Sequence, residues 1–533
     1  MKIGLFLSRD NGSISETLDL DALAKQYAHL AHVEIVDHFF NPDSYKRILK
    51  QVDSKHLEAV IIAGNSVKYY TITVSGESIF EMLIQKGINE NKIAVANIRE
   101  HVAWPHKNNK KDALKKAKLI IDTAVAKVEM RHDLNVVRVT PRKSVLIIGT
   151  RAGGLISAFE LLKKDYKVFI VEKESSIHPQ NAISEVLLPT ATVVEMHPNT
   201  TLFLRSQVDD ISGWCGEYRV KLRTPKGSME ILVGGIILSV GEDTEWISSL
   251  SPKLQLDIDD DGHLASQERA IIPGMTKDPG VWFIPTKQAE DIVVGAHGAN
   301  MAVQWLTTSL DKKEILHPVW VSEVDPDVCG GCGTCVKTCA FAASKLDVEK
   351  HLSVIDLNRC KGCGNCVSAC PTGARDLIGF PEKYIFKAVD ILSEGVQKKG
   401  DPRILAFLCT GCGYPAADTA GELALKNPEY CYSPNVLPLQ VECGGSIDTQ
   451  FILHAFSKGF DGVALTVCRD GHCHHIVGNT DMERRVSLFR EVLRSRGIDA
   501  ERMRIIKVSP PQGKEFHEEI TKFTDDMRSK IRS

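Results

Sequence analysis

The first part of the chain alternates short apolar runs with segments of helical period. Residues 110–130 repeat apolar positions every three or four residues, which is typical of an amphipathic helix. The apolar runs have the length of buried strands and lie at 2–8, 33–39, 57–64 and 92–98. We therefore expect a small doubly wound α/β domain over residues 1–135.

After a short basic connector, the pattern predicts a strand, a glycine turn, a helix and a second strand that ends in an acidic residue. This order is typical of a dinucleotide-binding unit, in which Gly149 and Gly154 take the first and third glycine positions and Glu172 contacts the ribose. Arg151 stands at the second glycine position, where the backbone must approach a pyrophosphate. Two interpretations stay open: the Arg151 guanidinium pairs with phosphate, or the Rossmann-like fold of residues 143–312 is kept for packing without a nucleotide. The chain carries a single glycine fingerprint, so we expect no resident NAD(P)H site.

The last part of the chain repeats the alternation of the first. Helical periods occur at 449–460 and 482–497, and a further helix is predicted at 381–397. The apolar runs that read as strands lie at 403–409, 435–443, 461–468 and 502–509. We expect a second doubly wound domain over residues 400–533, so the chain as a whole is predicted to be a multidomain α/β protein.

The overall charge argues against a polyanionic partner. The 533 residues carry 65 Lys and Arg against 68 Asp and Glu, a net charge of -3, so nucleic acid is not an expected partner. No apolar run approaches the roughly 20 residues of a membrane helix, and the N-terminus has no signal-peptide pattern. We expect a cytoplasmic protein without membrane insertion of its own, which leaves a membrane-bound partner open.

The cysteines crowd into one part of the chain. Of the 15 cysteines only Cys215 lies in the first 328 residues, and the others fall between residues 329 and 473. Thiols are kept reduced in the cytosol, so this density argues for metal binding rather than disulfides. Cys215 and Cys431 are instead expected to be buried apolar residues.

Two copies of a CxxCxxCxxxC motif lie in a segment predicted to form a ferredoxin domain over residues 318–378. Pro371 follows the second copy and completes the bacterial ferredoxin signature, whereas Ala340 stands at this place in the first. In such a domain three sulfurs of one motif bind a 4Fe-4S cluster and the fourth ligand comes from the other motif. One cluster is therefore expected on Cys329, Cys332, Cys335 and Cys370, and the other on Cys360, Cys363, Cys366 and Cys339. Zinc is the alternative metal, although zinc sites favour separated CxxC pairs.

Five more cysteines follow the strands predicted in the last domain. Cys409, Cys443 and Cys468 each end a predicted strand, and Cys412 and Cys473 lie in the adjoining loops. Because the carboxyl ends of parallel strands meet at one sheet edge, these thiols are expected to converge on a further iron-sulfur cluster. Three histidines around the last of these cysteines keep a mixed Cys/His zinc site open, and otherwise hydrogen-bond cluster sulfurs or a partner surface. They are His472, His474 and His475.

Several stretches resemble the A-type subunit of heterodisulfide reductase, a flavin and iron-sulfur protein. They are "NIREHVAWPHKN", "MHPNTTLFLRSQVDDISGWCGEYRVKL", the strand-glycine-helix unit and the double ferredoxin motif. The last domain is similar to the delta subunit of methyl-viologen-reducing hydrogenase, in the stretches "CTGCGYPAAD", "VECGGSID", "CRDGHCHHIVGN" and "RSRGIDAERMRI". The B-type subunit of the quinone-interacting membrane-bound oxidoreductase fuses the same two modules, and the resemblance covers nearly the whole chain.

The resemblance implies FAD on the Rossmann-like domain and a 2Fe-2S cluster on the last domain, but the chain departs from the family pattern. The strand ends "FLSRDNGS" and "AGNSVKYY" lack the cysteines of an extra N-terminal cluster, which we expect to be absent. The stretches "KESSIHPQN" and "IPTKQAEDIVVG" replace flavin-facing segments, and a second dinucleotide domain is missing. Ser446 stands where the family favours arginine.

These features predict an electron-transfer subunit of an oxidoreductase complex of anaerobic metabolism. Two 4Fe-4S clusters and one 2Fe-2S cluster would carry single electrons between partner subunits of heterodisulfide reductase-like, hydrogenase-like or quinone-interacting type. Two alternatives stay open: a flavoprotein that bifurcates electron pairs at FAD, and a zinc-bearing scaffold. The candidate FAD-binding residues are Gly149, Arg151, Gly154 and Glu172. No residue is assigned a catalytic role, and stand-alone activity stays open.

Overall fold

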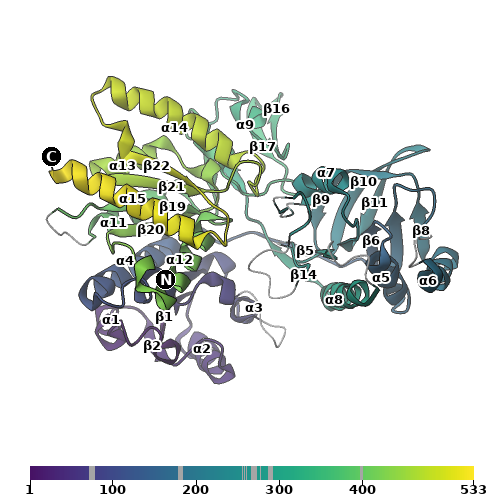
Figure 1. The fold of residues 1–533 in the computed structure, drawn as a ribbon, viewed down its shortest axis with the longest axis horizontal. Coiled ribbons are helices and arrows are strands. Elements are labelled where there is room, and N and C mark those ends of the chain that lie inside the picture. Colours follow the sequence, from purple (N-terminus) through teal and green to yellow (C-terminus); the bar gives the residue numbers. More distant parts are fainter. Residues whose placement is uncertain are drawn as a thin grey trace. The chain divides into compact units, whose positions relative to one another are not determined.

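The computed structural model describes residues 1–70, 78–177, 184–254, 256, 258–259, 261–265, 273–276, 278–285, 292–395 and 400–532. The chain forms two compact units (Figure 1). Unit 1 combines Met1–Leu134 with Trp320–Ser533, and unit 2 is Asn135–Val319. Unit 2 is therefore an insertion in the sequence of unit 1.

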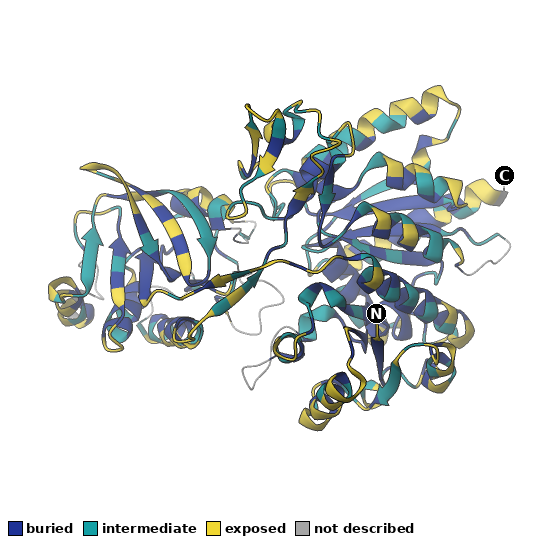
Figure 2. Cartoon of the chain, turned by 180° about the vertical axis from the view of Figure 1, so that it is seen from behind, coloured by how far each residue is buried: buried dark blue, intermediate teal, exposed yellow. Residues whose placement is uncertain are grey.

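The first sheet of unit 1 is built from the four apolar runs near the N-terminus. Its parallel strands lie in the order β2 (His32–Val36), β1 (Ile3–Ser8), β3 (Ala59–Gly64) and β4 (Ile93–Asn97). Every residue of β1 and β3 is buried, as parallel strands covered on both faces should be (Figure 2). The predicted α/β fold class is confirmed in this part of the chain.

Local sequence signals set where the helices of this first part begin. The helices are α1 (Leu20–Gln26), α2 (Pro42–Lys55), α3 (Ile79–Gln85) and α4 (Lys110–Met130). The Asn41 side chain caps α2, and Pro42 follows at the first helical position, where its missing N–H has no partner to lose. α3 begins with a capping box in which the Ser78 and Glu81 side chains each accept a hydrogen bond from the other's backbone N–H.

The doubled cysteine motif folds as two similar halves. The paired elements are β15 (Ser322–Val324) with β18 (Arg375–Leu377) and β16 (Ser344–Asp347) with β17 (Leu352–Ile355), both antiparallel. A short helix lies in each motif, α9 (Thr334–Lys337) in the first and α10 (Asn365–Ser368) in the second. Each helix follows a glycine in the left-handed conformation, Gly333 with φ 72° and Gly364 with φ 79°. The two motifs are therefore structural copies of each other.

The second sheet of unit 1 carries the last cysteines. Its parallel strands lie in the order β20 (Val436–Val441), β19 (Ile404–Cys409), β21 (Gly462–Val467) and β22 (Met503–Lys507). The helices that accompany it are α11 (Glu382–Ser393), α12 (Gly413–Lys426), α13 (Thr449–Ser457), α14 (Gly478–Ser495) and α15 (Gly513–Arg532). All residues of β19 and β21 are buried, so this domain too has the predicted doubly wound character.

Helix α11 belongs to the core of unit 1 rather than to a linker. Its buried residues, including Tyr384 and Leu392, share one apolar cluster with Leu119 of α4 and Phe451 of α13. The helix therefore packs between residues from the first and the last parts of the chain.

A buried carboxylate on α12 also connects the two sheets of unit 1. Asp418 is fully buried and accepts hydrogen bonds from Ser66 Oγ (2.5 Å) and from Asn97 Nδ2 (2.9 Å). A Cβ added at Gly421 would lie 2.1 Å from the carbonyl oxygen of Glu100, so α12 and the N-terminal domain meet in close backbone contact. These contacts fix the position of a helix whose first turn follows one of the predicted cysteine ligands.

Unit 2 contains a parallel and an antiparallel sheet. The parallel sheet has the order β13 (Val281–Phe283), β12 (Gly235–Leu238), β6 (Ser144–Ile148), β7 (Lys167–Val171) and β8 (Thr200–Phe203). The antiparallel sheet has the order β11 (Gly227–Val233), β10 (Glu217–Thr224) and β9 (Gln207–Trp214), and β14 (Ile315–Pro318) pairs with β5 (Val136–Val139). Val220 of β10 shares a buried cluster with Leu146 of β6, so the two sheets pack on one core.

The helices of unit 2 cover the parallel sheet. They are α5 (Ala152–Leu162), α6 (Ser184–Met196), α7 (Thr244–Leu254) and α8 (Ile292–Leu310). Leu155 of α5 and Leu306 of α8 belong to the same buried cluster as Val145 of β6. Across the described ranges of both units, no helix is both long enough and apolar enough to cross a bilayer.

Candidate metal centres

The second sheet brings the five C-terminal cysteines to its carboxyl edge. Cys409 ends β19, Cys443 and Cys468 follow β20 and β21, Cys412 precedes α12, and Cys473 lies in the loop before α14. Four of these thiols are buried, and the thiol of Cys473 is partly exposed. They meet although they are distant in sequence because parallel strands end at the same edge of a sheet.

The sulfur atoms of this set form one connected group. Cys409 Sγ lies 3.9 Å from Cys468 Sγ. Side-chain contacts also join Cys468 to Cys412 and Cys473, and join Cys473 to Cys443. Thiolates that share one metal centre must approach one another in this way, so the group has the donor chemistry of an iron-sulfur or zinc site.

One histidine of the neighbouring loop also reaches the sulfur atoms. His474 Nδ1 lies 3.8 Å from Cys412 Sγ and 3.7 Å from Cys468 Sγ, and the three ligand atoms lie within 4.8 Å of one another. A Cβ added at Gly411 would lie 2.4 Å from His474 Nδ1, so the glycine makes room for the ring. The mixed Cys/His alternative therefore has a geometric basis at this position.

Two residues at the start of α14 shape the site, and they were not among the predicted site residues. A Cβ added at Gly478 would lie 2.3 Å from Cys443 Sγ, so a side chain there would displace the thiol. Asn479 is buried and donates from Nδ2 to the carbonyl oxygens of Cys468 (3.1 Å) and Arg469 (2.9 Å). Their position directly after the cysteine-histidine loop is the sequence signal that could have identified them.

The crowded thiols hold their protons unequally. The contact with Cys473, together with burial, raises the pKa of Cys443, and the same contact lowers the pKa of Cys473. The hydrogen bond between Cys409 and Cys468 lowers the pKa of Cys409 and raises the pKa of Cys468. Because thiolates are the metal ligands, a metal that binds here must displace protons from the thiols whose pKa is raised.

Glycines between the ferredoxin cysteines allow the backbone to curve around each site. Gly331 and Gly362 hold the same place in the two motifs, and both have φ 63°. A Cβ added at Gly331 would lie 2.4 Å from the carbonyl oxygen of His351, and one added at Gly362 would lie 2.7 Å from that of Trp320. The left-handed backbone and the close carbonyl both exclude a side chain, so the glycines are required by the loop geometry.

Electrostatic contacts associate Cys339 with the second motif. Burial raises the pKa values of Cys360, Cys363 and Cys366, and Cys339 adds a smaller upward contribution to each. The thiol of Cys339 therefore lies within electrostatic range of all three, although it belongs to the first motif in sequence. This proximity supports the exchanged fourth ligand, which stays a prediction.

The other exchanged ligand, Cys370, lies in a segment that approaches the first motif. Cys370 Sγ is 3.6 Å from Thr372 Oγ1. A Cβ added at Gly330, the neighbour of Cys329, would lie 4.0 Å from Thr372 Cγ2. The predicted set of Cys370 with the first three cysteines is therefore sterically reasonable.

The second motif packs directly on the C-terminal site. A Cβ added at Gly364 would lie 2.5 Å from Ser446 Cβ. Ser368 Oγ donates to the carbonyl oxygen of Gly445 at 2.6 Å. Cys363 is also among the charges that raise the pKa of Cys443, although that pKa depends mainly on the contact with Cys473 and on burial. The second motif and the C-terminal cysteines are therefore neighbours.

Two side chains of α14 strengthen this contact. Asn365 Nδ2 donates to Asp481 Oδ2 at 2.5 Å. Arg485 donates from Nη1 to Asn365 Oδ1 (3.1 Å) and from Nη2 to the carbonyl oxygen of Gly445 (2.7 Å). Burial of the Arg485 guanidinium at this junction lowers its pKa.

The glycine turn of unit 2 has the tight geometry of a dinucleotide fingerprint. Gly149 has φ 88°, and a Cβ added there would lie 2.3 Å from the carbonyl oxygen of Ser239. A Cβ added at Gly154 would lie 2.4 Å from the carbonyl oxygen of Gly149. The Gly154 N–H donates to Ser239 Oγ at 2.9 Å, which holds the start of α5 close to the end of β12.

The residues that would bind FAD on this turn are engaged by protein groups instead. Glu172 is buried and accepts hydrogen bonds from the Thr150 N–H (2.8 Å) and hydroxyl (2.6 Å) on Oε2, and from the Lys173 N–H (2.8 Å) on Oε1. A Cβ added at Gly241 would lie 3.0 Å from Arg151 Nε, so the Arg151 side chain lies against the loop after β12. Because β12 and β6 are adjacent, this side chain crosses the edge where a pyrophosphate would bind. In this arrangement the residues do not fit FAD, and we derive no step through a flavin.

Parts of the two stretches that depart from the flavin pattern lie outside the described residues. These parts are residues 178–181 and 286–291. The expectation that both isolated cysteines are buried is confirmed for Cys215, which lies in the apolar core of unit 2, and is wrong for Cys431, which is partly exposed.

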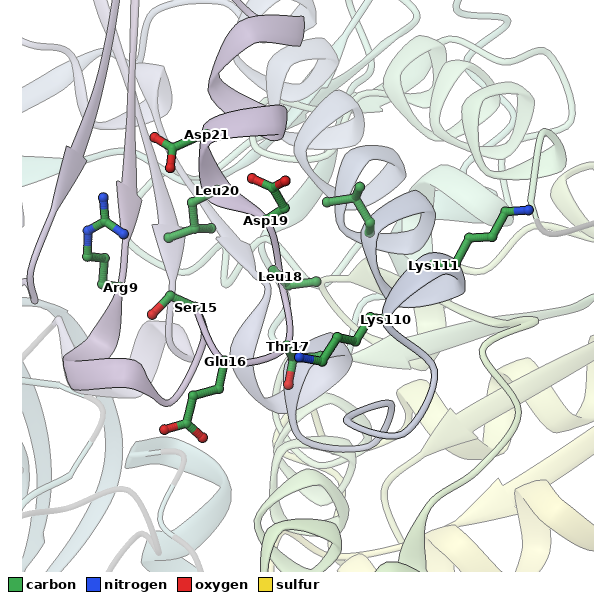
Figure 3. A pocket seen from close by; sticks show the side chains of 11 residues that line it. Arg9, Ser15, Glu16, Thr17, Leu18, Asp19, Leu20, Asp21, Lys110 and Lys111 are labelled. Carbon is green, nitrogen blue, oxygen red and sulfur yellow. The ribbon is translucent and has the colours of Figure 1, made fainter.

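A pocket of about 490 Å³ opens near the carboxyl end of β1 (Figure 3). Arg9, Lys110 and Lys111 line it together with the carboxylates of Glu16, Asp19 and Asp21. Asp19 already accepts a hydrogen bond from the Ala22 N–H at 2.9 Å, which caps α1. The described lining residues include neither cysteine nor histidine, so the pocket offers no thiolate or imidazole to a metal.

Two family models match the chain. The family described as "Methyl-viologen-reducing hydrogenase, delta subunit" matches residues 404–529, a range that contains all five C-terminal cysteines. The family described as "4Fe-4S binding domain" matches residues 353–376, a range that contains the four cysteines of the second motif.

Individual relatives extend these matches. The A-type subunit of a heterodisulfide reductase from Methanosarcina acetivorans is 22% identical over 788 aligned positions, which cover 99% of this chain and 97% of that protein. The aligned positions outnumber the 533 residues of this chain, so the alignment contains long gaps on its side. The corresponding heterodisulfide reductase subunit from Methanosarcina mazei is 32% identical over 298 residues, or 55% of this chain and 36% of that protein. The D-type iron-sulfur subunit of a hydrogenase from Archaeoglobus profundus is 35% identical over 133 residues, or 25% of this chain and 93% of that protein.

Proposed function

We propose that this chain relays electrons between partner redox subunits, because it is similar to the A-type subunit of heterodisulfide reductase and its last domain matches the family model of methyl-viologen-reducing hydrogenase delta subunits. The chain is an oxidoreductase subunit that carries a 4Fe-4S binding motif. The proposed relay has the second cysteine motif between the first motif and the C-terminal cysteines.

The residues of the relay hold the clusters and fix their positions. Bound iron-sulfur clusters take up and release single electrons, which is the chemistry they would supply here. The first proposed 4Fe-4S set is Cys329, Cys332, Cys335 and Cys370, and the second is Cys360, Cys363, Cys366 and Cys339. The proposed 2Fe-2S cluster takes its ligands from Cys409, Cys412, Cys443, Cys468 and Cys473.

The observation that carries the proposal is the direct contact between the second motif and the C-terminal site. Gly364 meets Ser446, and the hydrogen bond from Ser368 to Gly445 lies within the same junction. Cys443 stands next to this turn, and its charge environment includes Cys363. A buried and hydrogen-bonded junction holds the two centres next to each other. Electron transfer between centres requires that they lie close together.

The proposed partners follow from the names of the relatives. The chain is similar to heterodisulfide reductase subunits, and its last domain matches the family model of a hydrogenase subunit. We therefore expect partners of these two kinds. Flavin-based bifurcation is not part of the proposal, because Glu172 and Arg151 are engaged by protein groups.

Metal analysis of protein purified without oxygen tests the proposal. Two 4Fe-4S clusters and one 2Fe-2S cluster correspond to about ten iron atoms and as many acid-labile sulfides per chain. The Cys468→Ser variant should lose about two of each, and Cys431→Ser should lose none. A colourless protein that contains zinc and little sulfide would contradict the proposal and favour the zinc scaffold.

A further inference from the structure

The two cysteine motifs are copies whose surroundings differ. In the second copy Gly364 meets Ser446, and Val367 is 7% exposed. In the first copy a Cβ added at Gly333 would meet no atom within 4 Å, and Val336 is 36% exposed. Gly333 and Val336 hold the same places in their motif as Gly364 and Val367. Within unit 1, Ser446 of the C-terminal domain therefore covers the glycine turn of the second copy, and Val367 packs in a cluster with Leu377 of β18. The equivalent positions of the first copy are open.

The two motifs also differ in the surroundings of a polar position and in the exposure of a cysteine ligand. Ser368 in the second copy donates a hydrogen bond to Gly445, whereas its counterpart in the first copy is Lys337, which is exposed. Cys332 is exposed, and its counterpart Cys363 is partly buried. The first proposed cluster thus has a ligand at the protein surface, but the second is shielded by the chain's own last domain.

Apolar side chains are exposed around the open copy. Val328, the neighbour of Cys329, is 45% exposed, and Val348, after β16, is 71% exposed. Further exposed apolar residues between the two motifs are Leu346, Val354 and Leu357. A contiguous apolar patch, rather than a single exposed side chain, marks an interaction site, and Val328 and Val336 lie next to or within the open motif.

Resting on the proposed relay, we infer that the open face of the first motif docks a separate redox protein in the way that the C-terminal domain docks on the second motif. The docking face is defined by the exposed counterparts of residues in the second motif, namely Cys332, Gly333, Val336 and Lys337. Docking in this way requires that the partner place a turn of small residues against Gly333. The turn Gly444–Ser446 of this chain lies against Gly364 in the same manner.

The charge of the docking face specifies the partner further. Lys337 takes the place of the neutral Ser368, so the partner needs an acidic residue opposite it. The partner's redox centre then lies near Cys332, as Cys443 lies near Cys363. A partner without a redox centre would cover this ligand and end the relay, so the inference commits to a redox protein.

Photo-cross-linking in the native host, grown without oxygen, tests the inference on the full chain. The cross-linking residue p-benzoylphenylalanine replaces Val336, and in the control it replaces Val492 of α14, which is also exposed. We expect a cross-link from position 336 to a distinct subunit that contains a flavin or an iron-sulfur cluster, at least tenfold stronger than from position 492. No cross-link, or one to residues 135–319, to a second copy of the chain or to a protein without a redox centre, overturns the inference.

Charge variants supply a second readout. Val336→Glu and Lys337→Glu should each reduce at least tenfold the co-purification of the cross-linked subunit, while the iron content stays that of the unchanged protein. If the Val336→Glu variant loses iron, the co-purification result for Lys337→Glu alone decides the test. Unchanged co-purification with Lys337→Glu overturns the inference. Failure of the proposed function looks different, because the unchanged protein would then lack clusters altogether.

Discussion

Ser446 packs against Gly364 so closely that a Cβ on the glycine would lie 2.5 Å from the Ser446 Cβ. This contact joins the second ferredoxin motif to the turn that follows Cys443. It also accounts for the small residue at 446, where the family resemblance favours arginine. The guanidinium at this junction comes instead from Arg485 of α14, which donates to the carbonyl oxygen of Gly445.

Alanine at Gly364 should damage the junction more than alanine at its counterpart. Both Gly364 and Gly333 have positive φ, so alanine costs about 1–2 kcal/mol of left-handed strain at either position. Gly364→Ala adds overpacking against Ser446, which costs a further ~1–3 kcal/mol. Thermal unfolding, followed by the loss of cluster absorbance, should therefore begin at a lower temperature in Gly364→Ala than in Gly333→Ala. Equal midpoints for the two variants would show that the contact contributes nothing.

Removal of the Asp418 carboxylate should weaken the attachment of the N-terminal domain. Asp418→Ala leaves the buried Ser66 hydroxyl and Asn97 amide without their acceptor. Unsatisfied groups of this kind destabilise a protein by about 1–3 kcal/mol each, and partial relaxation makes a total of roughly 3 kcal/mol reasonable. Chemical unfolding monitors the change, with the exposed Glu429→Ala as control. A midpoint that matches the control would mean that the two sheets do not depend on this carboxylate.

The buried lysine of α4 should make stability depend on alkaline pH. Lys116 is fully buried with Nζ 2.9 Å from His106 Nε2, and burial lowers the pKa of Lys116 from 10.5 to about 7. Between these two values the unfolded chain binds a proton that the folded chain does not, so the free energy of unfolding rises with pH. The rise is on the order of 5 kcal/mol across the window.

Substitution of this lysine tests the assignment. Lys116→Met should remove the contribution of this lysine and so make the rise smaller, and Lys111→Met, on the exposed side of α4, should keep it. Unfolding curves measured from pH 7 to 10.5 give both slopes. Parallel pH dependence in all three proteins would assign the rise to other groups.

Acid extraction should release no stoichiometric flavin. Glu172 already accepts hydrogen bonds from Thr150 and Lys173, and the Arg151 side chain lies over Gly241. A pyrophosphate and ribose would have to displace all of these contacts. The same sample must contain iron and sulfide, so that loss of cofactors during purification is controlled. A yellow supernatant with one flavin per chain would mean that these side chains move to admit the cofactor.

The elements and the ligand candidates could be predicted from the sequence because their determinants are local. The spacing of Cys360, Cys363 and Cys366 follows from the geometry of one cluster. Cys409, Cys443 and Cys468 each end a buried apolar run, and parallel topology brings such ends to one edge. Which of the gathered thiols bind metal stays a prediction.

The contacts between distant segments could not be predicted in the same way. Ser66 and Asp418 are 352 residues apart in sequence, and no local pattern pairs a serine after one strand with a carboxylate on a remote helix. The hydrogen bond from Thr150 to Glu172 could not be predicted for a similar reason. The dinucleotide fingerprint describes the residues that contact a ligand and not their alternative hydrogen-bond partners inside the protein. The insertion of unit 2 within unit 1 likewise depends on long-range packing.

Electron paramagnetic resonance of the fully reduced protein tests the central claim most directly. If the second motif and the C-terminal cysteines hold neighbouring clusters, their unpaired spins interact, and the spectrum is broadened and relaxes faster than the sum of separate clusters. The part of the interaction that involves the C-terminal cluster should disappear in Cys468→Ser, while the 4Fe-4S signals and the coupling between those two clusters persist. A spectrum of the unchanged protein that equals the sum of independent clusters, or that shows no signal at all, would contradict the account.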